Sequence, residues 1–515
     1  MDDLLKRTRR WSLPLVLLFY RGLPSAFFIC SLEYIAPEKQ NYWCIDDSGA
    51  RRHNGTDQCH YLSGDGRENA CTAWEYQIKS TLTSEFNAVC DRKDLRRWAQ
   101  SALMFGMMMG NLIFSHISDW YGRRTICLLS HLCILGGGIA CSFAPTFPVW
   151  ISLRIIMSLG LGGNQNGPFT LGMESTNPKN RALLAVGDTF GWVAGMIVLP
   201  IFPYFIHDWR QLQFAISLST VPMLMMAWYV DESPRWLVAT RKIERVKTVV
   251  GKILERNGMQ RSPDDVDDII SRCVQEHQKA LSEPKTTLVD LFKTPGRALT
   301  TISLYLQYPL NILVYYNLFY LILALDTGGL FANLLWAGLF ETPVLLLVYL
   351  LVEHFNRRSL HFMCNFSAVV CCAVSFLYPG MGALYQLLLA TIAKMGVQVD
   401  YSVLGVHVNE IYPTRVRGIA LGSCVTISRL GAILSPFAHD QDTINESLLN
   451  SLACLVALFL VIPLRETYGK PLPDKFEDAD NDQSELGVED IENAQPLLDH
   501  DLRDDSNVLK RRCSF

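Results

Sequence analysis

The sequence predicts an all-α membrane protein with twelve transmembrane helices arranged as two six-helix halves. Three observations support this fold class. The apolar residues form long runs, basic residues cluster in alternate connections between those runs, and the second half of the chain repeats charged positions of the first. Hydrophobic residues make up 50% of the 515 residues, a share that a large soluble enzyme also reaches, so their distribution along the chain decides the class.

The apolar runs are each about 20 residues long, which is the length a helix needs to cross a bilayer. About twelve runs are present, near residues 12–35, 99–118, 125–143, 147–172, 183–205, 211–230, 298–323, 329–352, 360–378, 381–402, 418–438 and 448–464. Because a spanning segment must satisfy its own backbone hydrogen bonds in lipid, we expect every run to be a helix.

Basic residues mark one side of the membrane when the twelve runs are threaded in order. The clusters are Lys6, Arg7, Arg9 and Arg10, then Arg123 and Arg124, Lys179 and Arg181, Arg357 and Arg358, and Arg415 and Arg417. The positive-inside rule assigns this side, with both termini, to the cytoplasm. The first run continues to about Ile35 without a small-residue cleavage site, which favours a retained span over a signal peptide.

The loop over residues 36–97 is then extracellular. It contains four candidate disulfide cysteines and the candidate glycosylation site Asn54, as in an oxidised ectodomain; the cysteines are Cys44, Cys59, Cys71 and Cys90. Four cysteines allow three pairings, and the sequence leaves the choice open. The other cysteines lie mostly in spans, where small buried apolar residues are expected, and no metal site is predicted.

The chain divides into four predicted parts: an amino-terminal six-helix half over 1–230, a central cytoplasmic helical loop over 231–297, a carboxy-terminal six-helix half over 298–466, and an acidic disordered cytoplasmic tail over 467–515. No glycine-rich phosphate loop is present, which excludes an ATP-driven pump. No nucleophile and base pair occurs at useful spacing either, so we expect neither an enzyme, nor a cofactor, nor a nucleic-acid partner.

An internal repeat relates the two halves. At an offset of about 234 residues, or one or two more, the aligned pairs are Asp119 with Glu353, Arg123 with Arg357, Arg124 with Arg358, Glu174 with Glu410, Arg181 with Arg417 and Glu232 with Glu466. The stretch "SDWYGRR" at 118–124 joins the second and third spans through a tight turn at Gly122. We expect Asp119 to pair with an arginine or a helix amino terminus of the neighbouring bundle.

Several motifs carry a resemblance to a known family. "SDWYGRR" follows the second span, "LRIIMSLGLGG" lies in the fourth, "DESPRWL" follows the sixth and "NEIYPTRVRG" follows the tenth. In this order they resemble the major facilitator superfamily, specifically the solute carrier 22 family of organic ion transporters, over residues 12 to 474. The chain departs from the family at Ser115, at Trp120 and at "EHFNRR", the incomplete second copy of the loop motif.

The resemblance implies a major facilitator fold and transport by alternating access, in which the two halves rock about a central site. It also implies a gating network at the loop motifs, comprising Asp119, Gly122, Arg123, Arg124, Arg154, Glu232, Arg235, Glu410 and Arg417. For Arg123 and Arg124, ordinary topogenic residues remain the alternative.

Ionisable residues inside spans are costly and therefore candidates for function; here they are Arg21, Arg154, Asp188, Glu341, Lys394, Asp400 and Arg429. By the resemblance, Glu341 and Arg429 face a common cavity and suit a zwitterion, the acid opposing an ammonium group and the guanidinium gripping a carboxylate. The alternative is a structural salt bridge between these two residues.

Aromatic residues complete the predicted substrate site. Tyr315, Tyr316 and Trp336 are candidates to hold a quaternary ammonium group. Tyr315 and Tyr316 are adjacent and point about 100° apart on a helix, so we expect only one of them to line the cavity. Asp400 is a candidate to bind a coupling proton or sodium ion, through water with Lys394, the alternative being a position at the membrane edge.

The expected function is a plasma-membrane secondary-active or facilitative carrier of small organic cations or zwitterions, carnitine-like compounds first, embedded in membrane lipid with Na⁺ or H⁺ as candidate coupling ions. Two alternatives stay open: an organic anion exchanger in which Arg429 dominates, and a non-transporting relative that acts as a receptor or scaffold, with Ser115 and Trp120 marking a lost gating cycle.

Overall fold

The structure is a computed structural model of the chain. It describes residues 13–37, 40–45, 51–52, 59–62, 68–71, 73–175, 181–256, 287–325, 327–439 and 443–469, with isolated residues between 267 and 275 and residue 473. The candidate glycosylation site Asn54, the amino-terminal basic cluster and the acidic tail from residue 474 lie outside the described residues, as do the side chains of Asp188, Arg181 and Arg415.

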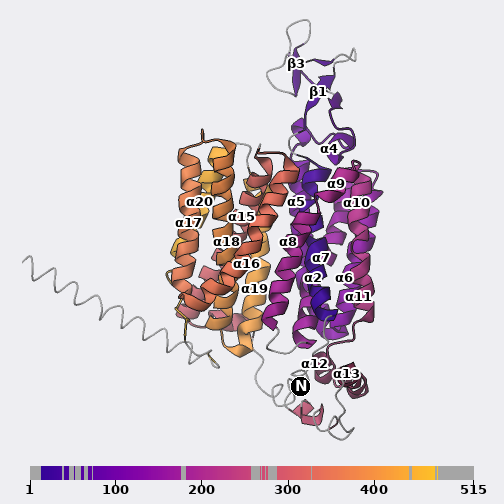
Figure 1. The fold of residues 1–515 in the computed structure, drawn as a ribbon, viewed down its shortest axis with the longest axis vertical. Helices are drawn as coiled ribbons and strands as arrows, with labels where there is room; N and C mark the ends of the chain where they lie inside the picture. The colour runs from indigo at the N-terminus through magenta and orange to yellow at the C-terminus, as the bar shows by residue number, and fades with distance from the viewer. Residues whose placement is uncertain are drawn as a thin grey trace, which may run out of the picture.

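Among the described residues, twelve long helical segments form the bundle, six in each half, as predicted. Figure 1 shows the two halves side by side. The first half contains α2 (Leu13–Cys30), α5 (Leu95–Tyr121), α6 (Arg123–Ser142), α7 (Phe147–Ser175), α8 (Arg181–Val198) and the interrupted segment α10 (Trp209–Leu218) with α11 (Val221–Tyr229). The second half contains α15 (Pro295–Ala324), α16 (Leu330–His354), α17 (Arg357–Leu377), α18 (Ala383–Ile411), α19 (Thr414–Ala438) and α20 (Thr443–Leu460).

Length and hydropathy alone qualify six stretches of the described helices as membrane spans. Three further apolar helices are shorter over the described residues, and α15 is not among the six; it carries Gln307, Asn311 and Asn317, each at most 3% exposed. These side chains face the interior of the bundle, where a polar group finds partners that lipid does not offer.

Short elements cover one end of the bundle, here called the strand end (Figure 1). They are α3 (Leu32–Ile35), β1 (Tyr42–Ile45), β2 (Arg51–Arg52), β3 (His60–Leu62), β4 (Glu68–Ala70), β5 (Ala73–Tyr76), α4 (Leu82–Glu85), the 3-10 helix Cys90–Arg92 and α9 (Ile201–Phe205). β1 pairs antiparallel with β2 and β5, and β3 pairs with β4. Disulfides join Cys44 to Cys71 and Cys59 to Cys90, which selects one of the three pairings left open by the sequence.

The opposite end carries α12 (Pro234–Ala239), α13 (Ile243–Arg256) and the 3-10 helix Leu288–Phe292, and is here called the α13 end (Figure 1). Helices α12 and α13 pack through a small apolar core that includes Trp236, Leu237, Val246 and Val250. The amphipathic pattern of this segment therefore serves packing between the two helices.

Packing within each half is close. α5 and α6 both lie against α7, α15 lies against α19, and α17 lies against α18 and α20. The glycines of the fourth span serve this packing, because a Cβ at Gly162 would overlap the backbone of Met107 on α5.

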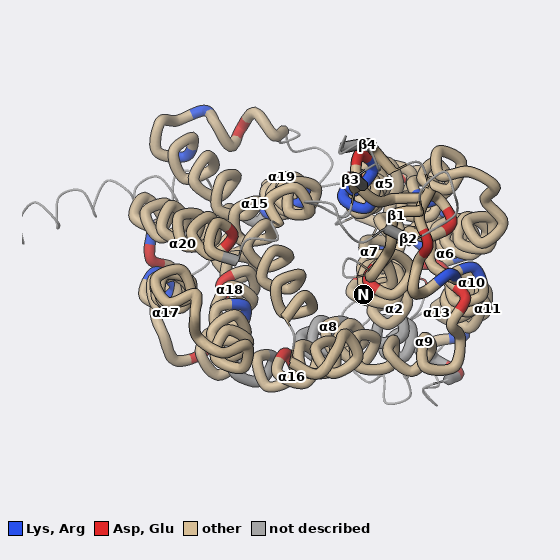
Figure 2. Tube along the Cα trace, turned by 90° about the horizontal axis from the view of Figure 1, so that it is seen from above, with Lys and Arg blue, Asp and Glu red and all other residues tan. Residues whose placement is uncertain are grey.

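The two halves meet along two helix pairs, α5 with α19 and α8 with α16; the second pair lies at one edge of the bundle in Figure 2. Near the strand end, the rings of Trp98 and Phe437 lie 5.0 Å apart, and the Ser101 hydroxyl donates to the Ile433 carbonyl at 2.7 Å. These contacts hold the halves together at the strand end.

Candidate functional site

A cavity of about 200 Å³ lies between the two halves, at the middle of the bundle. The first half lines it with residues of α2, α7 and α8, and the second half with residues of α15, α16 and α18: Arg21, Gly22, Ser25, Ile29, Gln165, Thr189, Trp192, Ile312, Tyr315, Tyr316, Glu341, Gln398 and Tyr401. The clefts that hold drug-sized ligands measure ~300–1,000 Å³. This cavity therefore suits a small solute.

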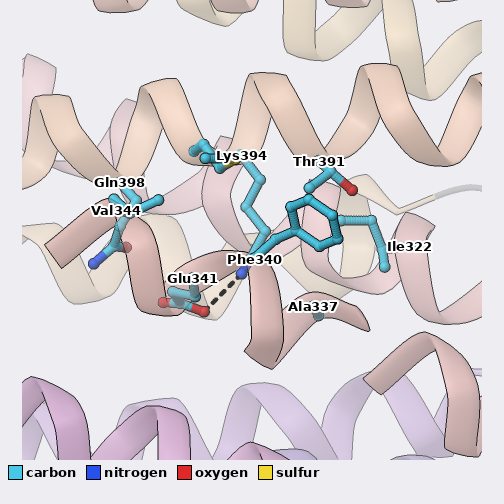
Figure 3. Close-up of a pocket in the computed structure, with 9 residues that line it drawn as sticks. Ile322, Ala337, Phe340, Glu341, Val344, Thr391, Lys394 and Gln398 are labelled. Atoms are coloured by element: carbon cyan, nitrogen blue, oxygen red, sulfur yellow. Dashed lines mark hydrogen bonds and ion pairs between the residues drawn. The ribbon is translucent and has the colours of Figure 1, made fainter. Parts of the chain in front are cut away.

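Glu341 lines the cavity, and its partner is Lys394. The Lys394 Nζ lies 2.9 Å from Glu341 Oε2, and both side chains are less than 6% exposed (Figure 3). Tyr315 donates its hydroxyl to Glu341 Oε1 at 3.0 Å. The Lys394 ammonium also lies 4.8 Å from the centre of the Tyr315 ring. An opposite charge and a hydroxyl thus stabilise the carboxylate in the membrane interior.

The ion-pair partner of Glu341 differs from the one considered from the sequence. Glu341 does not pair with Arg429, and Lys394 turns to Glu341 on α16 and away from Asp400 on its own helix. Six residues along α18 correspond to about 9 Å of rise, so the neighbouring helix offers Lys394 the nearer acid.

Arg429 does not line the cavity itself but contacts Gln165, which does. Its Nη2 donates to the side-chain oxygen of Gln165 at 2.9 Å, a contact between the two halves. The backbone carbonyl of the same Gln165 accepts a hydrogen bond from Arg21. Among the described residues, none accepts a hydrogen bond from Arg429 Nε, although the arginine is only 8% exposed. A buried guanidinium with an unused donor is a ready anion-binding group.

The aromatic lining differs in part from the prediction. Tyr315 and Tyr316 both line the cavity, with ring centres 5.3 Å apart, so the expectation that only one does was wrong. Their rings tilt edge to face, which brings both to the same space despite the angle between their Cα–Cβ bonds. Trp336 lies outside the lining: its ring packs at a tilt against Phe340, with ring centres 4.4 Å apart, and its indole N–H donates to Thr391.

Charged side chains form a first loop cluster at the α13 end, where α5 meets α6. Arg123 donates to the Glu174 carboxylate at 3.1–3.2 Å, and the backbone N–H groups of Arg123 and Arg124 donate to Glu232 at 2.9–3.2 Å. Burial raises the pKa of Glu232 above its usual range, while these N–H groups oppose the shift. These contacts make Glu232 the cap of the amino terminus of α6.

Gly122 is required by the first loop cluster. Its φ of 103° lies in the region that L-residues avoid, and a Cβ there would overlap the Glu232 carboxylate. Asp119, which is 71% exposed, pairs with Arg123 of its own loop at 3.1 Å. Of the two partners expected for Asp119, an arginine or a helix amino terminus of the neighbouring bundle, the structure shows an arginine, although one of its own loop, and Glu232 caps α6.

A second loop cluster repeats this arrangement where α16 meets α17. Arg357 pairs with Glu410 at 2.9 Å, and the backbone N–H groups of Arg357 and Arg358 each donate to Glu466 at 2.9 Å. Burial raises the pKa of Glu466, but the N–H groups of Tyr468, Arg358, Arg357 and Thr467 outweigh it, and the net shift is downward. The incomplete motif "EHFNRR" thus builds a complete cluster.

Comparison with known proteins identifies the family. The family profile described as "Sugar (and other) transporter" matches residues 69–475. The chain belongs to this family of transporters. It is 29% identical to the "Beta-alanine transporter" of Drosophila melanogaster, covering 79% of this chain and 68% of the relative. It is 28% identical to "Organic cation/carnitine transporter 2" of Homo sapiens, covering 80% and 74%.

A third relative is "Solute carrier family 22 member 6" of Oryctolagus cuniculus. It is 25% identical to this chain, and the match covers 83% of this chain and 78% of the relative. The chain is thus a solute carrier 22 relative, a transporter and not an enzyme. Its fold matches the inward-open structure of the xylose transporter XylE from E. coli with a TM-score of 0.62 and 16% identity, covering 89% and 97% of the two chains. That match shows the major facilitator fold.

Two residues of the transporter lie away from their predicted sites. Arg154 donates to the Ala99 carbonyl at 3.3 Å and lies 5.0 Å from the Trp150 ring. Asp119 follows Ala99 by about 30 Å along α5, so Arg154 does not join the first loop cluster. Asp400 is fully buried against Asn311 and His361 and does not line the cavity.

The remaining gating candidates lie at the α13 end. Arg417 donates to the Tyr412 carbonyl at 3.3 Å, and Arg235 lies in the first turn of α12. The sequence analysis did not single out Gln165, although the polar triplet Asn164, Gln165 and Asn166 interrupts the fourth span and was the available signal.

Proposed function

We propose that this transporter carries small zwitterionic organic solutes, which have one carboxylate and one amine or quaternary ammonium group, by alternating access. The observation that carries the proposal is the charge balance at the cavity. Lys394 neutralises Glu341 at 2.9 Å, whereas Arg429 contacts the lining residue Gln165 and forms no ion pair with an acid of the described residues. The net charge of these side chains at the cavity is therefore positive, and we expect a substrate to need a carboxylate that balances it.

The carboxylate binds at Arg429. This guanidinium already donates to a neutral amide oxygen of Gln165 and keeps Nε for a second acceptor. A carboxylate replaces the amide with a charge-assisted and potentially two-pronged hydrogen bond. Because the contact bridges the two halves, substrate binding at this point also acts on the interface that must open and close during transport.

The ammonium group binds on the opposite wall, beside Tyr315, Tyr316 and Glu341. Aromatic faces attract such cations by about 0.5–2 kcal/mol. Lys394 uses the Tyr315 ring in the same way at 4.8 Å, so a substrate ammonium takes over a position that already suits a cation. A simple organic cation gains this contact but meets the positive surplus, and we therefore expect it to be a poor substrate.

Two of the relatives support a zwitterion. They are named as transporters of β-alanine and of organic cations and carnitine. β-Alanine and carnitine each combine a carboxylate with a cationic nitrogen. The second candidate function is organic anion transport. The Glu341–Lys394 pair favours it, because the pair neutralises the one acid among the described residues that line the cavity.

The same proposal includes orientation and gating. We assign the strand end to the outside of the plasma membrane, since it carries two disulfides, and the α13 end with both termini to the cytoplasm. The contacts Trp98–Phe437 and Ser101–Ile433 then form the outer gate, and the two loop clusters lie at the inner one.

Uptake by variants expressed in cells tests whether Arg429 binds the carboxylate of the substrate. We expect Arg429→Gln to raise the KM for labelled carnitine by about ten- to a hundredfold, the effect of losing a hydrogen bond to a charged group. Arg245→Gln, which removes an exposed arginine of α13, is the control and should match the wild type. Equal KM values for both variants at normal surface expression would refute carboxylate binding at Arg429.

Lys394→Gln separates the zwitterion from the anion reading. The change leaves Glu341 with the Tyr315 hydroxyl and without its cation. We expect uptake of tetraethylammonium to rise relative to carnitine, because the acid becomes available to a substrate cation. If instead uptake of an aromatic carboxylate exceeds that of carnitine in the wild type and falls in Lys394→Gln, the anion function replaces the zwitterion function.

A further inference from the structure

A chain of buried polar side chains runs through the second half, apart from the cavity. Asp400 Oδ1 lies 2.6 Å from His361 Nδ1, His361 Nε2 lies 3.1 Å from His407 Nδ1, and His407 Nε2 lies 2.7 Å from the Arg465 carbonyl. All three side chains are 0% exposed. They come from α17 and α18, and the chain ends in the segment that follows α20.

The number of protons in this chain follows from its three contacts. The Arg465 carbonyl only accepts, so His407 Nε2 carries a proton, and each of the other two contacts needs one proton as well. Two neutral imidazoles supply two N–H groups. The third proton resides either on the Asp400 carboxyl group or on a ring that becomes imidazolium, and in both cases the net charge of the group is zero.

Removal of that proton leaves two acceptors facing each other at one of the three contacts. A buried pair of lone pairs without a proton between them is costly, so one contact must open. The contacts join α17 to α18 and α18 to the Arg465 segment, which precedes Glu466 of the second loop cluster. Protonation is thereby linked to the packing of helices at the α13 end.

The position of the chain links the cavity with that end. Asp400 and Asn311 each lie next in sequence to a residue of the cavity lining, Tyr401 and Ile312 respectively. His407 lies seven residues further along α18, about 10 Å towards the α13 end. We propose that Asp400, His361 and His407 form the binding site and path of a proton that is coupled to substrate transport, an inference that rests on the transport function proposed above.

The surroundings of Asp400 favour a proton over a sodium ion. Na⁺ prefers several oxygen ligands, but the groups that face the carboxylate are an imidazole nitrogen and the amide nitrogen of Asn311, at 2.5 Å. The described His, Cys, Asp and Glu residues include no group of three that suits a metal ion.

The charged and titratable neighbours come from every helix packed against α18. They are Tyr308 of α15, Glu341 of α16, Arg357 and Cys364 of α17, Cys424 of α19, Cys454 of α20, Arg465 after α20, and Lys394 and Glu410 of α18 itself. Arg357 pairs with Glu410 and Lys394 with Glu341, and Arg465 donates to backbone carbonyls of Glu410 and Ile411, so none of these cations pairs with Asp400. The proton on the Asp400 group is therefore bound without a competing ion pair.

The test compares Asp400→Asn with His131→Gln in the full-length protein reconstituted in vesicles. Asparagine keeps the size of the side chain but cannot exchange a proton. His131 is the control, a fully buried histidine of α6 that contacts the Cys127 carbonyl. The probe is labelled carnitine, and its uptake is measured with the substrate side one pH unit more acidic and with equal pH.

We expect the gradient to raise wild-type uptake, up to the about tenfold accumulation that one coupled proton supports. His131→Gln should keep this ratio, and Asp400→Asn should reduce it to about one. A ratio unchanged in Asp400→Asn, or absent in the wild type while carnitine exchange at equal pH proceeds, would overturn the coupling but leave the transport proposal intact.

A second readout does not depend on flux. Purified wild-type protein and Asp400→Asn in detergent are titrated with a pH dye, and the wild type should take up one more proton per molecule. If carnitine does not move at all, the transport proposal fails, and this count still decides the proton site: equal counts in the two proteins would refute it.

Discussion

The two loop clusters make the same contacts, but a different aromatic residue serves as a hydrogen-bond donor in each. In the first, Trp236 Nε1 donates to the Asp119 carbonyl at 3.0 Å; in the second, Tyr468 Oη donates to the Glu353 carbonyl at 3.0 Å. In the first, Arg124 donates to the Trp228 carbonyl, and in the second Arg358 donates to the Ile462 carbonyl. The comparison teaches that a backbone acceptor can be kept in both halves even where the side chain that donates to it differs, as with Trp236 and Tyr468.

The difference lies in how tightly each cluster binds its capping carboxylate. Glu466 receives four backbone N–H groups and has a lowered pKa, whereas Glu232 is more deeply buried, receives three and has a raised pKa. Glu232 is therefore the less stable anion.

The largest difference in unfolding free energy between matching variants of the two clusters is expected at their turns. Gly122→Ala places a Cβ against Glu232 at a φ of 103°, and should cost about 2–4 kcal/mol of unfolding free energy. The matching residue Asn356 has a φ of −60° and an exposed side chain, so Asn356→Ala should stay within about 0.5 kcal/mol of the wild type. Thermal unfolding of the purified proteins in detergent measures both, and equal losses would refute the role assigned to the glycine.

The second-largest difference in unfolding free energy is expected between variants of the two capping acids, Glu466 and Glu232. Glu466→Gln removes a favoured anion from four N–H donors and should cost about 2–3 kcal/mol at pH 7. Glu232→Gln removes an anion that burial already disfavours, so its cost should be smaller. The same thermal measurement ranks the two variants, and a larger loss in Glu232→Gln would reverse the comparison.

The aromatic donors follow. Trp236→Phe should cost about 1–2 kcal/mol, because Trp236 is 5% exposed and loses both volume and a hydrogen bond. Tyr468→Phe removes only a hydroxyl from a residue that is 40% exposed, and should cost about 0.5 kcal/mol. Chemical denaturation in mild detergent compares the two variants. Equal denaturation midpoints would show that the two donors contribute equally to stability, which would contradict this prediction.

The smallest effect is a pH dependence. A raised folded-state pKa means that the stability from protonated Glu232 is present below the ordinary value of 4.5 and is lost as pH rises through the folded value. The gap between wild type and Glu232→Gln should therefore widen as pH falls from 7 to 5, by less than about 1.4 kcal/mol. Glu466 has a lowered pKa, so the gap for Glu466→Gln should stay constant over this range. Melting curves at both pH values test the contrast.

The spans and the repeat could be predicted because they depend on local composition and on spacing along one chain. The helices extend the predicted runs at their polar ends, as in α18, which continues from the run ending at 402 to Ile411. Those turns are polar, and hydropathy alone does not separate them from loops.

Contacts between helices could not be predicted in the same way. Lys394 and Glu341 are 53 residues apart, and their pairing depends on how α16 and α18 rotate about their axes. His361 and His407 were not singled out, because a single histidine in an apolar span carries no sign of the 3.1 Å contact that joins it to another. The residue types of the site were evident, but their partners needed the fold.

The most direct test of the central claim is uptake by the wild-type protein of labelled carnitine, β-alanine, tetraethylammonium and an aromatic carboxylate in one assay. The positive surplus beside the paired Glu341 predicts saturable uptake of the two zwitterions, in excess of both the cation and the anion. Uptake of tetraethylammonium alone would contradict the account, because the cavity would then hold a cation without using Arg429.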